Sequence, residues 1–328
     1  MPSVFFLGAT GYVGGSVLVA FRERYPSLPI TALVRNPAHV DTIRSTGVAV
    51  LQGSFTDTAL IEEQSYAHDI VVNTADSDDV PFVEAILRGS RRRADEGKAK
   101  SVFIHTSGVA VFLDDGKDGR FDPGAKVWND NDEDDIKAIT PDRLHGQVDF
   151  PILQAGKEGY VETYIISPAA IVGDSRGPVN NGSFFLKFVV QFYTALQRAV
   201  YVGEGSNHFT LVHIDDVVDL FLRVFELSVK PSVSTSPHAR YFIATSGPVA
   251  WKTIATVVGG ELARRGLLAD STPQSVALAD LPPMVSFMGA SERVVGERSL
   301  ALGWKARPVS LEDNIERDID AVLNVVRG

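Results

Sequence analysis

The stretch that decides the fold of this chain is Val4-Phe5-Phe6-Leu7-Gly8-Ala9-Thr10-Gly11-Tyr12-Val13-Gly14-Gly15. Its apolar beginning is typical of a buried strand, and glycines follow at once. Apolar residues then recur at helical spacing, at Val13, Val17, Ala20, Phe21 and Tyr25. Glycines between a strand and a helix let backbone N–H groups approach a pyrophosphate, and the helix N-terminus favours negative charge. The stretch predicts a dinucleotide-binding loop; a purely structural glycine turn is the alternative.

The composition sets outer limits on function. Of the 328 residues, 45% are hydrophobic, so the chain can bury a large core. The net charge of −10 argues against a nucleic-acid surface, which needs a basic stripe. The absence of cysteine excludes disulfides, thiolate metal sites and a cysteine nucleophile. With no signal-peptide pattern and no apolar run near the ~18 residues of a membrane helix, we expect a cytoplasmic protein without a membrane or nucleic-acid partner.

Strands alternate with helices along the first half of the chain. Apolar runs predict strands, and capping residues with helical periodicity predict helices between them. This rhythm predicts an α/β fold with a doubly wound parallel sheet. The predicted strands are 4–7, 30–34, 48–51, 70–74, 102–106, 161–166 and 241–244, and the predicted helices include 80–93, 141–156 and 183–198.

Residues 114–135 differ from their surroundings. They contain nine acidic and three basic residues and show no apolar periodicity, which predicts a solvated, mobile surface insertion. A cation site at 130–135 is the alternative, but the segment lacks the glycine and terminal glutamate of a calcium-binding loop. We therefore predict no metal. A segment leaving the carboxyl end of a strand is also placed to cover a ligand.

Several motifs resemble those of one enzyme superfamily. The GATGYVG of the first loop resembles the N-terminal signature of the extended and atypical short-chain dehydrogenase/reductases, which include sugar-nucleotide epimerases and NmrA-like proteins. Residues 167–173 resemble that family's segment along the nicotinamide, residues 209–217 its "FVHVDDVA" segment, and 302–304 its late "LGW" motif. Because the matches run in order, the resemblance covers nearly the whole chain.

The resemblance implies two interleaved domains. A dinucleotide-binding Rossmann domain is expected at 1–175, with 209–245 returning to it and the acidic insertion at 114–135. A smaller, mostly helical substrate domain is expected at 176–208 and 246–328. We expect a monomer or homodimer.

Arg35, at the end of the second predicted strand, favours NADP over NAD. NAD binders usually carry an acid there for the ribose 2′-hydroxyl, whereas a guanidinium suits a 2′-phosphate. A solvent-facing arginine is the alternative. By resemblance Asp57 meets the adenine amino group, although it also suits a helix cap. The predicted cofactor-binding residues are Gly8, Thr10, Gly11, Tyr12, Val13, Gly14, Arg35, Asp57, Thr74, Ala75, Thr106, Ser107, Pro168 and Ile171.

The chain departs from the family at the catalytic residues. The family uses a serine or threonine after the fifth strand and a Tyr-x-x-x-Lys pair on the next helix, and no such pair occurs in this sequence. Alignment on Asp149 places Pro141 at the tyrosine position and His145 at the lysine position. Gly108 stands at the serine position, one residue after Ser107. His145 is the main acid–base candidate because imidazole titrates near neutrality, and Ser107 is the second. A structural histidine is the alternative.

Three further residues are weaker catalytic candidates, namely His105, His213 and Lys157. His213 belongs to a family motif that suggests a structural role, and Lys157 follows the predicted end of the helix.

Two functions of different classes fit these features. The first is an atypical NADP-dependent reductase or isomerase acting on a small apolar or aromatic carbonyl, enone or imine, because the phenylalanine-rich run at 183–193 begins the expected substrate wall. The second is a non-catalytic NADP-binding redox sensor of NmrA type. A sugar-nucleotide epimerase ranks third, since it needs the missing tyrosine.

Overall fold

The computed structural model describes residues 1–179, 181–231 and 234–327. A seven-stranded, wholly parallel sheet runs through its centre in the order β11-β7-β5-β4-β1-β2-β3. The fold prediction of a doubly wound parallel sheet is confirmed. The strands are β1 (Val4–Leu7), β2 (Ile30–Val34), β3 (Ala49–Gln52), β4 (Ile70–Asn73), β5 (Ser101–Thr106), β7 (Val161–Pro168) and β11 (Tyr241–Ala244).

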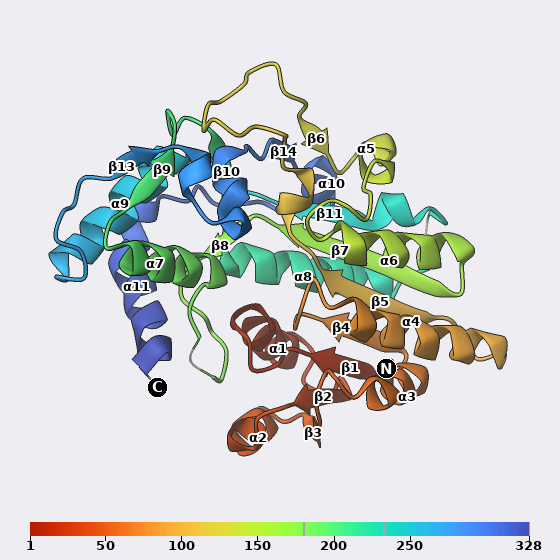
Figure 1. The fold of residues 1–328 in the computed structure, drawn as a ribbon. Coiled ribbons are helices and arrows are strands. Elements are labelled where there is room, and N and C mark those ends of the chain that lie inside the picture. Colours follow the sequence, from red (N-terminus) through yellow and green to blue (C-terminus); the bar gives the residue numbers. More distant parts are fainter. Residues whose placement is uncertain (180, 232–233, 328) are drawn as a thin grey trace.

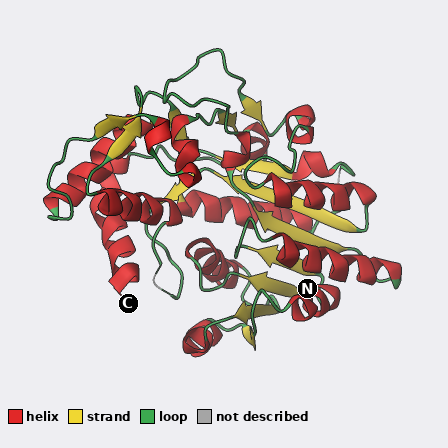
Figure 2. Ribbon diagram, viewed as in Figure 1, coloured by secondary structure: helices red, strands yellow, loops and turns green. Residues whose placement is uncertain are grey.

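Helices cover both faces of this sheet (Figures 1 and 2). Helices α1 and α8 pack together on one face, and α3, α4 and α6 lie on the other. The inner strands β1, β2 and β4 are almost wholly buried and apolar, because a parallel sheet between two helical layers is covered on both faces, whereas the edge strand β3 is partly exposed. The helices of this part are α1 (Tyr12–Arg24), α2 (Val40–Arg44), α3 (Thr58–Ala67), α4 (Val80–Asp95), α6 (Gly146–Glu158) and α8 (Ile214–Ser228).

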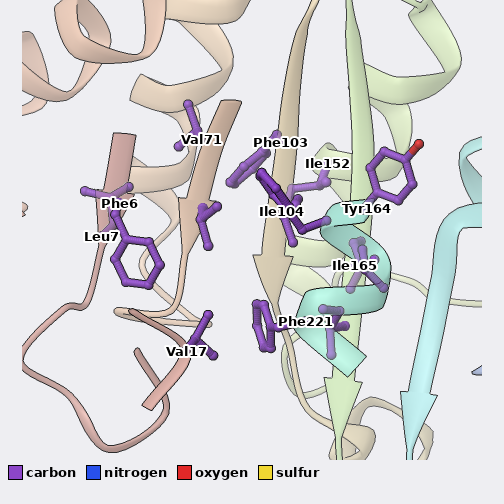
Figure 3. Packing of buried hydrophobic residues seen from close by; sticks show 14 of the residues in the cluster. Phe6, Leu7, Val17, Val71, Phe103, Ile104, Ile152, Tyr164, Ile165 and Phe221 are labelled. Carbon is purple, nitrogen blue, oxygen red and sulfur yellow. The ribbon is translucent and has the colours of Figure 1, made fainter. Parts of the chain in front are cut away.

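The core between these layers is close-packed. Figure 3 shows side chains of β1, β4, β5 and β7 interleaved with Val17 of α1, Phe221 of α8 and Ile152 of α6. All three helical residues are 0% exposed. This packing fixes the carboxyl ends of the strands, where the predicted site residues lie.

A second hydrophobic cluster lies in the later part of the chain. It joins buried residues from 172 to 211 with buried residues from 251 to 322, whereas β11 and most of α8 belong to the first cluster. The elements are β8 (Ala170–Val172), α7 (Phe184–Leu196), β9 (Val200–Val202), β10 (His208–His213), β12 (Gly247–Ala250), α9 (Trp251–Arg264), β13 (Gln274–Val276) and α11 (Leu311–Arg327). Strands β12, β10 and β8 form a small sheet, and β13 pairs with β9.

The acidic insertion is more ordered than its composition predicts. It contains β6 (Trp128–Asn129), which pairs with β14 (Val294–Val295), and most of α5 (Glu133–Lys137). Figure 1 shows β6 and α5 beside α10 (Glu297–Ala301) and β11. Asp130 is 0% and Asp135 is 4% exposed, so the prediction of a solvated segment is wrong for these two residues, whereas Asn131, Asp132 and Asp134 are exposed.

The hydrogen bonds of Asp130 explain why its carboxylate is buried in this insertion. Its carboxylate accepts hydrogen bonds from the backbone N–H of Ile243 (2.9 Å) on the free edge of β11 and of Arg298 (2.7 Å) on α10. Ser299 Oγ then donates to the Ile243 carbonyl (2.8 Å). The insertion and α10 thus cover an edge strand whose polar groups would otherwise be unpaired. Among the described residues, no group of three or more His, Asp or Glu side chains could hold a metal ion.

We predict that Asp130→Ala lowers the free energy of unfolding by about 2–4 kcal/mol, because it leaves buried N–H donors without an acceptor. Asp122→Ala, in the exposed half of the same insertion, should cost under about 1 kcal/mol. Urea denaturation measures both. Equal losses for the two variants would contradict the assigned role of Asp130.

Candidate functional site

The glycine loop between β1 and α1 is held by close backbone contacts. Gly8 has a φ of +94°, and a Cβ there would lie 2.6 Å from the carbonyl carbon of Thr74. A Cβ on Gly14 would lie 2.2 Å from both the Gly8 oxygen and Thr74 Oγ1. Gly11 is the N-cap residue of α1, and its N–H donates to the Gly8 carbonyl (2.8 Å). The loop therefore lies tight against the end of β4.

This geometry fits a dinucleotide pyrophosphate. Helix α1 has 13 residues and carries no acidic residue of its own in the first turn, which suits an anion at its N-terminus. The strand order reverses between β1 and β4, which is where ligands bind in open α/β sheets.

We predict that Gly14→Ala abolishes NADPH binding, because the added methyl has no space between Gly8 and Thr74. Isothermal titration calorimetry measures the affinity. Gly260→Ala on α9 is the matched control, since a Cβ there meets nothing within 4 Å. Retained affinity in the Gly14 variant would contradict the assignment of the loop.

Several predicted cofactor-binding residues lie at this edge but use their side chains on the protein itself. Thr74 Oγ1 donates to the Leu7 carbonyl (2.7 Å), and Thr106 Oγ1 donates to the Asn73 carbonyl (2.9 Å). The Ala75 N–H donates to Asn73 Oδ1 (2.9 Å). These contacts tie the ends of β1, β4 and β5 together and leave the backbone to face a ligand.

The other predicted residues of the loop face the segment after β8. Tyr12 OH donates to the Gly173 carbonyl (2.6 Å), and burial raises its pKa well above the ordinary value. The Thr10 carbonyl accepts from Asn181 Nδ2, and Val13 is partly buried against the core. Pro168 ends β7 and Ile171 lies in β8, so the segment expected along the nicotinamide is joined to the glycine loop through Tyr12.

Arg35 and Asp57 lie at the other end of the predicted cofactor site. Arg35 is exposed just after β2, with its guanidinium carbon 5.7 Å from the centre of the Phe55 ring. Asp57 is the N-cap of α3, and its Oδ1 accepts from the Leu60 N–H (3.0 Å). The capping role expected for Asp57 is therefore present, and its exposed carboxylate lies in the loop that follows β3.

His145 lies across from the carboxyl end of β5. It is the N-cap of α6, with a left-handed φ of 63°. Its Nδ1 is 2.9 Å from Oδ1 of Asp78, and a Cβ on Gly108 would lie 2.8 Å from its Nε2. The imidazole thus occupies the space that a serine side chain at position 108 would need. Because a carboxylate only accepts hydrogen bonds, Nδ1 carries a hydrogen, and Nε2 is the nitrogen free to exchange a proton.

The surroundings of His145 favour its charged form. Burial alone would lower the pKa of His145, but the hydrogen bond and charge of Asp78 outweigh burial and raise it, with smaller contributions from Asp149 and Glu292. Burial also opposes ionisation of Asp78, yet its bond to His145 lowers its pKa. Glu292 is 1% exposed, and burial raises its pKa to about 7. His145 and Asp78 therefore form a hydrogen-bonded dyad in which each favours the charged form of the other.

The helix that carries His145 begins later than the sequence predicts. Residues 141–145 form turns and a bend, and α6 begins at Gly146, where a Cβ would lie 2.1 Å from the Thr140 carbonyl oxygen. Pro141 is therefore not on the helix. Lys157 is in the last turn of α6, at the opposite end from His145, so the predicted helix end at Gly156 is wrong.

Ser107 and His213 both have hydrogen-bond partners within the protein. Ser107 is 5% exposed, and its Oγ donates to Asp149 Oδ2 (2.7 Å). His213 is the N-cap of α8, and its Nδ1 accepts from the Asp215 N–H (3.2 Å).

Sequence reasoning singled out neither Asp78 nor Glu292. Asp78 directly precedes Asp79, the N-cap of α4, so the sequence suggests only helix capping for the acids at this place.

Comparisons with known proteins agree with this geometry. Residues 8–126 match a protein family described as NAD(P)H-binding. The chain is 26% identical over 322 residues to oxidase ucsJ of an Acremonium species, covering 92% of each chain.

Solved structures share the fold over nearly their whole length. UDP-glucose 4-epimerase of Thermotoga maritima, solved with UDP-glucose, has a TM-score of 0.65, 13% identity and 99% coverage of both chains. The dTDP-glucose 4,6-dehydratase of Bacillus anthracis, solved with NAD, has a TM-score of 0.62 at 14% identity and covers 99% of this chain and 97% of its own. Residues 8–126 are therefore similar to an NAD(P)H-binding domain, and the chain shares its fold with these epimerase and dehydratase structures. No helix in the described ranges is long and apolar enough to cross a membrane.

Proposed function

We propose that the protein is an NADP-dependent oxidoreductase in which His145, paired with Asp78, exchanges a proton with a small apolar or aromatic substrate. The observation that carries this proposal is the free Nε2 of His145 beside Gly108, with Nδ1 hydrogen-bonded to a carboxylate. A histidine held by an acid can replace the missing tyrosine as proton donor, because both need only a titratable group at the substrate oxygen or nitrogen.

The reaction balances with one hydride and one proton. When bound, the reduced cofactor supplies two electrons and one hydrogen to the substrate carbon. Nε2–H of the protonated His145 donates the proton to the carbonyl oxygen or imine nitrogen, and Asp78 stabilises the charged imidazole throughout. For an enone, the carbon–carbon double bond takes the hydride and the enolate takes the proton. The reverse direction uses neutral His145 as the base.

The aromatic side chains of α7 support an apolar substrate. Phe188 stacks on Phe192 at an interplanar angle of 9°, and its ring centre lies 5.6 Å from that of Phe287. Phe184, one turn earlier on the same helix, is 82% exposed. A phenylalanine surface binds aromatic or other apolar groups better than sugars.

A panel of aromatic aldehydes, ketones, enones and imines, assayed by loss of NADPH absorbance, tests this function. Oxidation of NADPH by at least one compound is expected. Binding of NADPH without oxidation by any compound would instead favour the sensor of NmrA type. Because no tyrosine–lysine pair is present in the sequence, a sugar-nucleotide epimerase is the third candidate.

We predict that NADPH binds more tightly than NADH, because Arg35 is exposed at the end of β2 and no acid stands there. Arg35→Asp should weaken NADPH binding by about 1–3 kcal/mol and leave NADH binding nearly unchanged. Arg44→Asp, on α2, changes the net charge equally and is the control. Equal affinity of the native protein for both cofactors, by calorimetry, would contradict this prediction.

We predict that His145→Ala lowers kcat about 10²–10⁴-fold while NADPH affinity stays within about twofold. Since Asp78 raises the pKa of His145 above its ordinary value of 6.5, reduction by the native protein should be fastest below that pH and decline as pH rises through the raised pKa. Steady-state kinetics across pH measures both effects. A rate unchanged by the substitution would remove His145 from the mechanism; loss of NADPH affinity alone would assign it to cofactor binding.

A further inference from the structure

A buried polar cluster lies behind the His145–Asp78 dyad. At its centre is Asp149, which is 0% exposed. Its Oδ2 accepts hydrogen bonds from Ser107 Oγ (2.7 Å) and Tyr241 OH (2.9 Å). Asp149 lies one turn after His145 on α6, and its backbone N–H donates to the His145 carbonyl (3.0 Å). One carboxylate therefore joins the ends of β5 and α6 to β11.

Ser107 connects Asp149 to the backbone that lies beside the imidazole of His145. Ser107 directly precedes Gly108, whose backbone is extended (φ −157°, ψ 146°). Side chains of neighbouring residues in extended backbone point to opposite sides. Ser107 reaches inward to Asp149, and the Cβ direction of Gly108 points at the imidazole of His145. By holding Ser107, Asp149 fixes the distance between Gly108 and the proton-exchanging nitrogen.

The second oxygen of Asp149 has no hydrogen bond. Oδ1 lies 3.8 Å from Nε2 of His105, too far for one, and both atoms are buried without a partner. Nδ1 of His105 is 3.1 Å from the Asn73 amide nitrogen, which can only donate, so Nε2 carries the hydrogen of a neutral ring. Burial lowers the pKa of His105 to about 3, which keeps it uncharged. His105 thus offers Asp149 a dipole and no charge.

The charge of Asp149 consequently acts on His145. Burial raises the pKa of Asp149 to about 6, against the hydrogen bonds from Ser107 and Tyr241 and the charge of His145. Tyr241 stays neutral, because burial and the nearby carboxylate raise its pKa well above the ordinary value. At neutral pH the titratable groups acting on His145 are Asp78, Asp149 and Glu292, all of which favour its protonated form.

We propose that Asp149 is a positioning residue of the proton-transfer site, which sets the place of Gly108 against the imidazole through Ser107 and supports the proton on His145 through its buried charge. This inference rests on the proposed role of His145. If Asp149 served only to stabilise the fold, its charge would have no effect on the pKa of His145.

The test is Asp149→Asn, which keeps the shape and one oxygen acceptor but removes the charge. The pKa of the His145 imidazole is measured by NMR titration in the NADPH complex, with His145→Ala used to assign its signal. The pKa should fall in the Asn variant, and the pH at which the rate declines should fall with it. In the same variant kcat should fall about 10-fold or more, while NADPH affinity stays within about twofold.

A second variant keeps the inference falsifiable if Asp149→Asn does not fold. Ser107→Ala combined with Tyr241→Phe removes both donors but keeps the carboxyl group, so its proton is held more strongly and the pKa of His145 should again fall. An unchanged pKa of His145 in either folded variant overturns the inference. The NMR readout is independent of turnover: no detectable turnover with any substrate would contradict the proposed function, whereas an unchanged His145 pKa contradicts only the role of Asp149.

Discussion

The constraint on which this structure depends is the contact between the glycine loop and the end of β4. A Cβ at Gly14 would lie 2.2 Å from Gly8 and Thr74, so only glycine lets α1 begin this close to the sheet. The contact brings the N-terminus of α1 to the point where the strand order reverses. The other predicted site residues follow strand ends of the same sheet: Arg35 follows β2, Asp78 follows β4 and Gly108 follows β5.

The sheet edge that carries His145 differs from the corresponding edge of the family that the sequence resembles. The missing tyrosine and lysine are accompanied by three matched changes. The helix begins late, at Gly146; residue 108 has no side chain; and His145 fills the space beside it with its second nitrogen on Asp78. These features fit one another, because a side chain at position 108 would require the imidazole to shift from its present place. This arrangement fits the proton exchange that we propose for His145 better than a family site that has merely lost residues.

Much of the fold was predictable because buried parallel strands are apolar on both faces and glycine spacing marks the loop. The boundaries of β1, β2 and β11 follow directly from such runs. The position of α6 was not predictable, since Pro141 suits a helix start, while the tight contact of Gly146 with the Thr140 carbonyl is a tertiary feature. Likewise the burial of Asp130 was not predictable, because its hydrogen-bond donors, the backbone N–H groups of Ile243 and Arg298, are far away in the chain. Asp78 was missed for the same reason, because its partner is 67 residues away.

The most direct test of this account is a crystal structure of the protein with NADPH. We predict the pyrophosphate at the N-terminus of α1, the adenosine phosphate beside Arg35, and the nicotinamide beside Gly108, Pro168 and Nε2 of His145. A nicotinamide bound elsewhere, or an imidazole of His145 screened from it by protein, would contradict the central claim that this histidine exchanges the proton of a hydride-transfer reaction.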